Sequence, residues 1–354
     1  MTTPRRLVLA LMAVTVAATA CGSGSGSGGS GAPTVRLLTH DSFALSDGLL
    51  DSFTEETGIK VEVIQGGDAG AVVNQAILTN GNPQADVLFG IDSTFLTRAL
   101  DASLFVPYQA VGLDEVAADL QLDPDQHRVT PIDYGDVCLN YDKAYFAAHD
   151  LAVPAGLDDL VEPAYRGLLV VENPATSSPG LAFLLATIEV LGEPGWEAWW
   201  TKLRANDVAV VDGWEQAYNS TFSGGGASEG TRPLVVSYAS SPPAEVVFAD
   251  PPIDTPPTGV IESSCYRQVE AAGILSGSEH PEEAGRLIDF LLSTPVQADV
   301  PLSMFVLPAR GDVALPPVFV EHAAQPDRVL ELPPSQIEAH REEWIGRWTD
   351  LVLR

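Results

Sequence analysis

The sequence has few basic residues. It carries 18 Lys and Arg against 48 Asp and Glu in 354 residues, which gives a formal net charge of -30, and its lysines are Lys60, Lys143 and Lys202. Such a chain repels the phosphates of nucleic acids, which argues against a nucleic-acid partner, and it attracts cationic ligands. Salt tolerance or a composition bias of the genome is the alternative explanation, because net charge concerns solubility and steering rather than a site.

The sequence also lacks the short motifs of several enzyme classes. It has no Gly-rich phosphate loop before a helix, no His-Glu-x-x-His, no nucleophile elbow and no paired-cysteine zinc spacing. The six histidines are scattered, and His40 alone stands at a predicted strand end, where a lone histidine usually makes a hydrogen bond. We therefore expect no catalytic residues, no metal and no cofactor.

The first 33 residues predict targeting and a tether rather than folded structure. A basic start is followed by an apolar run too short to span a bilayer, and small residues precede Cys21. This pattern resembles a bacterial lipobox, so residues 1–21 are expected to be a lipoprotein signal with Cys21 as the lipidation site. Plain secretion with cleavage after Ala20 is the alternative. Residues 22–33 are rich in Gly and Ser and predict a flexible tether.

Two cysteines remain once Cys21 is assigned to the anchor. Cys138 and Cys265 each lie in a strand-like run, 131–142 and 261–269, and antiparallel pairing of these runs would place the two thiols opposite each other. In an exported protein an even pair indicates a disulfide. Two buried free thiols are the alternative.

Strand-like and helix-like segments alternate along the chain. This alternation predicts an α/β fold with parallel sheet and right-handed crossovers. The expected strands are 35–39, 60–64, 85–90, 168–171, 209–211 and 234–238. The expected helices are 42–58, 70–81, a helix capped by Ser93, 178–191 capped by Ser178, 281–292 and a last helix capped by Ser335. Residues 300–308 are expected to be extended.

The runs that carry Cys138 and Cys265 divide this alternation into two lobes. Lobe 1 is expected to comprise residues 34–136 and 266–354, and lobe 2 residues 137–265. The two runs would then be the crossings between the lobes, and a ligand would bind in the cleft that separates them.

Polar and aromatic residues gather at the predicted carboxyl ends of the strands, where ligands bind in open α/β sheets. They are Asp41, Asp68, Asp92, Asp133, Tyr134, Ser177, Ser178, Trp214, Tyr218, Tyr238, Ser240 and Ser241. Carboxylates, hydroxyls and aromatic faces suit a flat, cationic small molecule, since aromatic rings attract desolvated cations by about 0.5 to 2 kcal/mol each. For each residue packing is the alternative, and helix capping alone explains Ser178.

Six short motifs resemble, in order, those of the thiamine-binding substrate-binding proteins of bacterial ABC importers. They are residues 39–44, 85–92, 133–135, 176–181, 213–218 and 237–242, and the similarity extends from Val35 to the terminal helix. The resemblance implies a two-lobed, hinged type II periplasmic-binding-protein fold without enzymatic activity. It further implies a monomer that binds thiamine or its phosphates and has an ABC permease as partner. Together with the lipobox-like pattern at Cys21, this predicts a protein that is lipid-anchored on the extracytoplasmic face of the cell membrane.

The same resemblance assigns roles within the cleft. Asp68 with Ala69 matches a ligand contact, Ser177 with Ser178 matches a hydroxyl pair, and Trp214 matches a stacking indole. The loop that walls the ring system corresponds to Tyr238, Ala239, Ser240, Ser241 and Pro242. Three positions depart from the family pattern. His40 occupies the position of an aromatic residue of the family, Phe305 occupies that of a tryptophan, and a further tryptophan is replaced near Asp47.

Three rival ligands or activities remain at this point. The same scaffold would accept another organic cation, such as a polyamine. Ferric iron fits less well, because the adjacent tyrosine pair of ferric binders is missing. A secreted enzyme that degrades thiamine would need a reactive cysteine in the cleft.

Overall fold

The computed structural model describes residues 32–225 and 228–354, and Pro33–Arg354 form one compact unit within it. The expected lipoprotein signal, Cys21 and nearly all of the expected tether lie outside the described residues. In the described part of the chain, every helix is too short or too polar to cross a bilayer.

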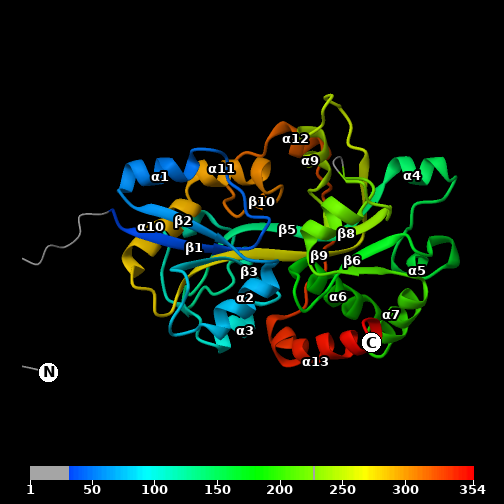
Figure 1. The fold of residues 1–354 in the computed structure, drawn as a ribbon, viewed down its shortest axis with the longest axis horizontal. Helices are drawn as coiled ribbons and strands as arrows, with labels where there is room; N and C mark the ends of the chain where they lie inside the picture. Colours follow the sequence, from blue (N-terminus) through cyan, green and yellow to red (C-terminus); the bar gives the residue numbers. More distant parts are fainter. Residues whose placement is uncertain (1–31, 226–227) are drawn as a thin grey trace, which may run out of the picture. The chain divides into compact units, whose positions relative to one another are not determined.

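The strands of this unit form a ten-stranded sheet in the described chain, with the order β2-β1-β3-β9-β5-β8-β6-β7 (Figure 1). A first parallel group consists of β1 (Thr34–Thr39), β2 (Lys60–Gln65) and β3 (Val87–Asp92). A second parallel group consists of β6 (Leu169–Glu172), β7 (Ala209–Val211) and β8 (Leu234–Tyr238). The expected strands are therefore confirmed, in two groups rather than one parallel sheet.

Two long strands join these groups. β5 (Thr130–Asp142) and β9 (Thr258–Leu275) pair antiparallel along most of their length, β9 also pairs with β3, and β5 also pairs with β8. The ladder is irregular between Val137 and Leu139, and there a disulfide joins Cys138 to Cys265, whose Cα atoms are 4.3 Å apart. The predicted antiparallel pairing of the two runs and the predicted disulfide are both confirmed. The short strands β4 (Phe105–Val106) and β10 (Leu307–Pro308) pair antiparallel with β9 and β5, respectively.

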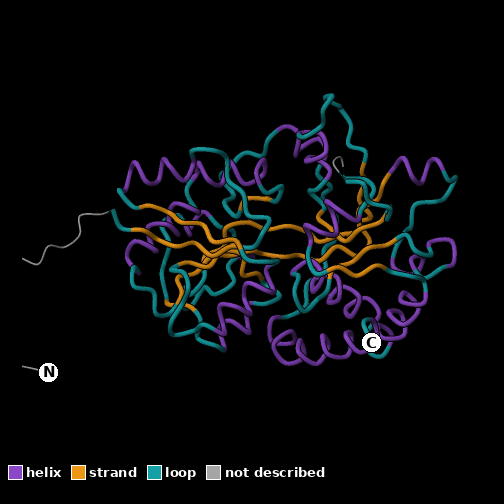
Figure 2. Tube along the Cα trace, in the orientation of Figure 1, coloured by secondary structure: helices purple, strands orange, loops and turns teal. Residues whose placement is uncertain are grey.

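Helices cover both faces of the strands, as the tube in Figure 2 shows. The helices that frame the site are α1 (Leu49–Thr57), α2 (Ala69–Leu78), α6 (Ser178–Leu191), α8 (Trp214–Gln216), α9 (Pro242–Val247) and α11 (Thr294–Ser303). The others are α3 (Leu96–Asp101), α4 (Lys143–Ala148), α5 (Leu157–Leu160), α7 (Gly195–Ala205), α10 (Pro281–Leu291), α12 (Pro317–His322) and α13 (Pro334–Val352). Single turns occur at Leu113–Glu115, Ala118–Leu120, Pro163–Tyr165 and Ala217–Thr221.

Several expected helix boundaries are wrong. The helix expected at 42–58 begins at Leu49, because Gly48 has a φ of 82° and ends an irregular segment that starts at Asp41. α3 begins at Leu96, and the Asp92 carboxylate rather than Ser93 accepts the backbone N–H groups of Thr94 and Phe95.

Three further expectations are corrected. The cap of α6 is Ser177, whose Oγ accepts from the backbone N–H of Gly180, and not Ser178. The segment 300–308, expected to be extended, belongs to α11 up to Ser303 and is extended only at β10. The last helix follows Pro333 and has no side-chain cap from Ser335.

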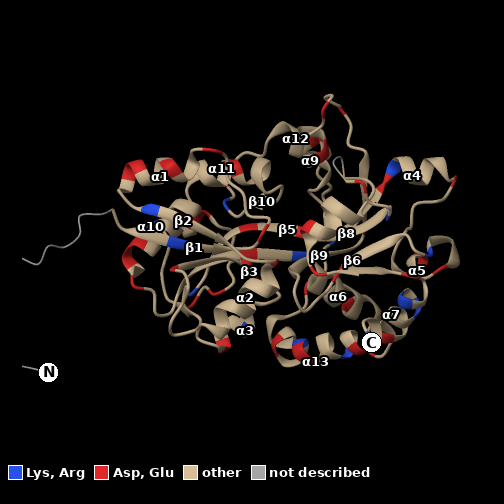
Figure 3. Cartoon of the chain, viewed as in Figure 1, with Lys and Arg blue, Asp and Glu red and all other residues tan. Residues whose placement is uncertain are grey.

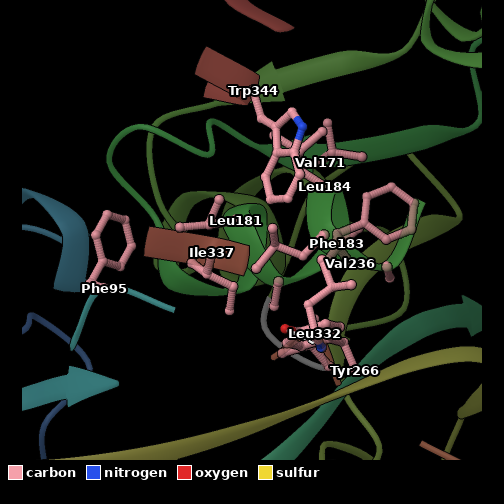
Figure 4. Packing of buried hydrophobic residues seen from close by; sticks show 14 of the residues in the cluster. Phe95, Val171, Leu181, Phe183, Leu184, Val236, Tyr266, Leu332, Ile337 and Trp344 are labelled. Carbon is pink, nitrogen blue, oxygen red and sulfur yellow. Dashed lines mark hydrogen bonds between the residues drawn. The ribbon is translucent and has the colours of Figure 1, made fainter. Parts of the chain in front are cut away.

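The largest apolar cluster lies between the sheet and helices α6, α7 and α13. Figure 4 shows side chains of α6, β6, β8 and α13 packed together, among them Leu181, Val171, Val236 and Trp344. Trp200 of α7 stacks edge to face on Trp348, with ring centroids 5.5 Å apart. A second cluster lies between the first strand group and helices α10 and α11. The largest cluster contains side chains of both strand groups, among them Leu38, Leu88, Val171 and Val236. The loops between strands and helices are left to form the site.

Candidate ligand-binding site

A cavity of about 870 Å³ lies at the carboxyl ends of the parallel strands, beside the crossing of β5 and β9. The segments that follow β1, β2, β7 and β8 contribute to its wall, together with the first turn of α6 and residues 303–306. The structure brings together in its lining the predicted residues Asp41, Asp68, Ala69, Asp133, Ser178, Trp214, Tyr218, Tyr238, Ser241 and Phe305. Its volume is in the range of small-molecule sites.

The other predicted residues lie outside this lining, in the part of the chain that the structure describes. They are Asp92, Tyr134, Ser177, Ala239, Ser240 and Pro242. Tyr134 faces away because side chains alternate along β5: Asp133 and Gly135 line the cavity, while Arg267 lies over the Tyr134 ring at 4.9 Å.

Each of the remaining residues outside the lining has a structural partner. Ala239 packs against the disulfide, and Pro242 is buried in the first turn of α9. Ser177 caps α6, and the Ser240 Oγ donates to the Phe305 carbonyl at 2.7 Å. These side chains therefore support the segments that line the cavity and do not line it themselves.

Three aromatic rings form one side of the cavity. Trp214 lies at the start of α8 and stacks on Tyr218, with centroids 5.1 Å apart and planes 17° apart, and the Tyr238 ring is 6.5 Å from Trp214. The indole N–H of Trp214 donates to the Ser237 Oγ at 2.9 Å, which fixes the ring. The Tyr218 hydroxyl donates to Glu245 Oε1 at 2.9 Å. A cation against these rings would be held by their π faces.

Asp68 joins the two sides of the cavity. It caps α2 by accepting the Ala69 N–H at 2.6 Å, and its other oxygen accepts the Trp214 N–H at 2.8 Å. Gly213 leaves room for this contact, because a Cβ there would be 3.1 Å from Asp68 Oδ2, a close approach from which Asp68 would have to shift. Burial raises the pKa of Asp68, and the hydrogen bond from the Trp214 N–H partly opposes this rise.

Asp92 supports the cavity from behind. Its Oδ2 accepts from Gln268 Nε2 at 2.7 Å and from the Ser178 Oγ, and both of those residues line the cavity. Burial raises its pKa to about 6, and the hydrogen bonds from Ser178 and Thr94 oppose this rise. Asp92 is therefore a positioning residue for two lining side chains.

The lining is acidic. Its carboxylates are Asp41, Asp68, Asp133, Glu215, Glu245, Asp250 and Glu270, and the described lining contains no Lys or Arg. Figure 3 shows the same excess of acidic over basic residues across the chain. Charges in a cleft with low-dielectric walls concentrate the field inside it, so the cavity attracts a cation.

Sequence reasoning named Asp133 as a candidate but missed Gln268 and Glu270, which form the floor of the cavity with it. Asp133 and Gly135 lie in the middle of β5, Gln268 and Glu270 lie in the middle of β9, and His40 lies beside Glu270 with Nε2 3.2 Å from Oε1. Burial acts to lower the pKa of His40, but the charge of Glu270, the hydrogen bond with it and the charges of Asp68 and Asp41 together raise it. The two-residue alternation of the crossing strands was the signal that could have found these residues.

The described residues include no group of three or more His, Cys, Asp and Glu that could hold a metal ion. The polar groups of the cavity are arranged for hydrogen bonding and charge recognition, and the paired Cys138 and Cys265 offer no free thiol there.

Comparison with known proteins reveals clear relatives. Residues 82–332 match the family described as bacterial extracellular solute-binding protein. The thiamine-binding periplasmic protein of Salmonella typhimurium is 30% identical over 326 residues, which cover 91% of this chain and 94% of that protein. The protein of the same name from Escherichia coli is 29% identical over 329 residues, which cover 91% and 94%. A solved structure of a periplasmic thiamin binding protein superimposes with a TM-score of 0.78 at 27% identity, over 91% of this chain and 97% of that one.

Proposed function

Because the chain belongs to the family of bacterial extracellular solute-binding proteins, we propose that it captures thiamine outside the cytoplasm and delivers it to an ABC importer. It is a substrate-binding protein of transport and not an enzyme. The observation that carries the choice of ligand is the cavity itself, where aromatic rings and carboxylates stand together without Lys or Arg in the described lining. Thiamine joins a permanently cationic thiazolium to a hydrogen-bonding aminopyrimidine and a hydroxyethyl tail, which complements this lining.

We assign different residues of the lining to different parts of the ligand. Trp214 and Tyr238 face the cationic ring, and Asp68 supplies a negative charge beside the Trp214 backbone. Ser178 and Ser241 offer hydroxyls to the polar parts of the ligand. Phe305 meets Phe248 edge to face in the cavity lining, with ring centroids 5.2 Å apart, and would shield the ligand from water.

Closure of two hinged lobes would complete the capture. The proposed lobes are residues 34–136 with 266–354, and residues 137–265, so the hinge lies on β5 and β9 next to the disulfide. Closing excludes water and strengthens the interactions between charges in the cavity. The protein would act as a monomer, tethered by a lipid on Cys21 to the extracytoplasmic face of the membrane, and would present the ligand to a permease.

Calorimetric titration with thiamine, thiamine monophosphate and thiamine diphosphate tests the proposal. We expect thiamine to bind more tightly than thiamine diphosphate, because the described lining offers no Lys or Arg to a phosphate and the Ser178 N–H already faces Asp68 Oδ1 at 3.4 Å. A polyamine such as spermidine, which lacks a flat ring, is expected to compete poorly. No heat with any form of thiamine would exclude the proposed function.

Trp214→Ala is expected to weaken thiamine binding by about 1 to 3 kcal/mol, or roughly 5- to 150-fold, because the π face that meets the cation is lost. The measurement is the dissociation constant from titration calorimetry. Tyr134→Ala is the matched control, since that aromatic residue on β5 faces Arg267 and not the cavity. An unchanged dissociation constant for Trp214→Ala, with the melting temperature preserved, would place the ligand elsewhere.

A further inference from the structure

Three titratable side chains from three segments meet on the floor of the cavity. His40 follows β1, Asp133 lies on β5, and Glu270 lies on β9 directly opposite Asp133 in the ladder. His40 Nε2 is 3.2 Å from Glu270 Oε1, and all three residues line the cavity. Asp133 is 2% exposed, and its Oδ2 has no hydrogen-bond partner. We call His40, Asp133 and Glu270 the floor cluster.

The backbone of β3 makes this close approach possible. Gly90 has a φ of 103°, and a Cβ there would lie 2.6 Å from the His40 Cδ2 and 3.6 Å from Glu270 Oε1. A side chain at position 90 would therefore push His40 away from Glu270. The arrangement depends on a glycine at this position and is not a chance contact of mobile surface groups.

The groups around the floor cluster are acidic or neutral. Asp41 and Asp68 act on His40 through their charges, and the Tyr238 hydroxyl on the β8 side donates to Gln268 Oε1 at 3.3 Å. Asp92 acts on Tyr238 from the end of β3, together with Glu270, Asp68 and Asp133. His40 is therefore the group of the floor cluster that can carry a positive charge, and Asp133 the carboxyl that faces another carboxylate across the ladder.

Burial and charge favour bound protons in this cluster. The pKa of Asp133 is raised well above its ordinary value by burial, then by the charge of Glu270 and the hydrogen bond with it. The pKa of His40 is raised as well, since the nearby charges of Glu270, Asp68 and Asp41 together exceed the opposing effect of burial. Without a ligand, the protonated forms of Asp133 and His40 are therefore favoured more than in exposed groups of the same kind.

We propose that the floor cluster couples capture of the cation to release of a proton into solvent. This inference rests on the proposed function and concerns how the same site selects its ligand. A fixed positive charge in the cavity disfavours the protonated forms of His40 and Asp133, so a proton leaves to the buffer while the cation takes its place beside the carboxylates. His40 and Asp133 then determine specificity, because a neutral ligand would gain nothing from this exchange.

The sign of the pH dependence follows by linkage. The ligand lowers the pKa values of His40 and Asp133. At a pH between the pKa values of the complex and those of the free protein, the complex therefore binds fewer protons than the free protein. Affinity for thiamine is therefore expected to rise with pH in that window, by up to about tenfold per pH unit for one released proton. Acidification reverses the effect and favours ligand release.

The experiment is calorimetric titration of the full chain with thiamine at pH 6, 7 and 8, at each pH in two buffers with different ionisation heats. The difference in heat between the buffers gives the number of protons released. Asp133→Asn and His40→Gln are both expected to lower that number and flatten the rise of affinity with pH. Thiamine's own titration is the same for every variant and cancels in the comparison.

Glu215→Gln is the charge-matched control. It removes one carboxylate from the lining at a residue that accepts from Asn219 Nδ2 at 2.6 Å and stands apart from the floor cluster. We expect weaker thiamine binding with the proton release preserved. Melting temperatures of all variants verify that each is folded.

The outcomes separate the two proposals. Absence of heat with thiamine at every pH would exclude the proposed function itself. Tight binding with equal heats in both buffers, and the same dissociation constant from pH 6 to 8, would overturn the floor-cluster inference alone. So would proton release that persists undiminished in both folded variants, Asp133→Asn and His40→Gln.

Discussion

Replacement of Asp68 by alanine is expected to lower thiamine affinity by about 2 to 4 kcal/mol, or roughly 30- to 1,000-fold. The carboxylate contributes charge inside a cavity whose described lining has no Lys or Arg, and it also bridges the cavity by accepting the Trp214 N–H. Its loss removes the negative charge, leaves the Trp214 amide without its acceptor and releases the backbone that carries the indole. Titration calorimetry measures the affinity, and the change should appear mainly as faster dissociation.

Asp68→Asn separates the two contributions of this residue. The amide keeps an oxygen that can accept from the Trp214 N–H, but it has no charge, so affinity should fall between the values for the wild-type protein and Asp68→Ala. Because Asp68 also caps α2, Asp68→Ala should melt lower by an amount that corresponds to about 1 kcal/mol, whereas asparagine can keep the cap. An affinity of Asp68→Ala within twofold of the wild type would show that the cation binds away from α2.

Removal of the disulfide by Cys138→Ala with Cys265→Ala is expected to lower the free energy of unfolding by about 2 to 5 kcal/mol. The bond closes a loop between residues 127 apart, so its loss frees a large part of the unfolded chain. It also leaves space where Cys138 and Cys265, each 1% exposed, were packed. Chemical denaturation followed by tryptophan fluorescence measures the difference.

Reduction of the wild-type protein under denaturing conditions serves as the comparison for this variant. Reduced wild-type protein should lose stability like the double variant, apart from the contribution of the smaller side chains. Equal unfolding midpoints for the oxidised protein and the double variant would contradict the prediction. Ligand affinity should change less than stability, since neither cysteine lines the cavity.

The order of strands and helices could be predicted because its signals are local. Apolar runs such as 234–238 and the helical periodicity of 281–292 depend on neighbouring residues, and the structure has both elements within a residue. The error at 42–58 has a physical cause, because Gly48 in the left-handed region starts α1 late and leaves the preceding segment free to line the cavity. The error at 300–308 has a cause as well. Its first residues belong to α11, which contains Pro301, and a proline normally argues against a helix interior.

The loop residues of the candidate site could be predicted, but of its floor only Asp133 was named. Asp68 and Trp214 lie shortly after strands and Tyr238 ends β8, so the carboxyl-end rule places them correctly at the cavity. Asp133 and Glu270 lie within the crossing strands, and their proximity depends on a register between residues far apart in the sequence. Tyr134 was misplaced for the same reason, since the face that a strand residue occupies depends on this pairing.

The positions of the two cysteines in the chain also determine when the disulfide can form during export. Cys265 follows Cys138 by 127 residues, and β6, β7 and β8 lie between them in the chain. A polypeptide that is exported amino end first exposes Cys138 to oxidants while its partner is still on the cytoplasmic side. The native bond can form only after all three intervening strands have emerged, so its appearance would mark the completion of translocation through residue 265.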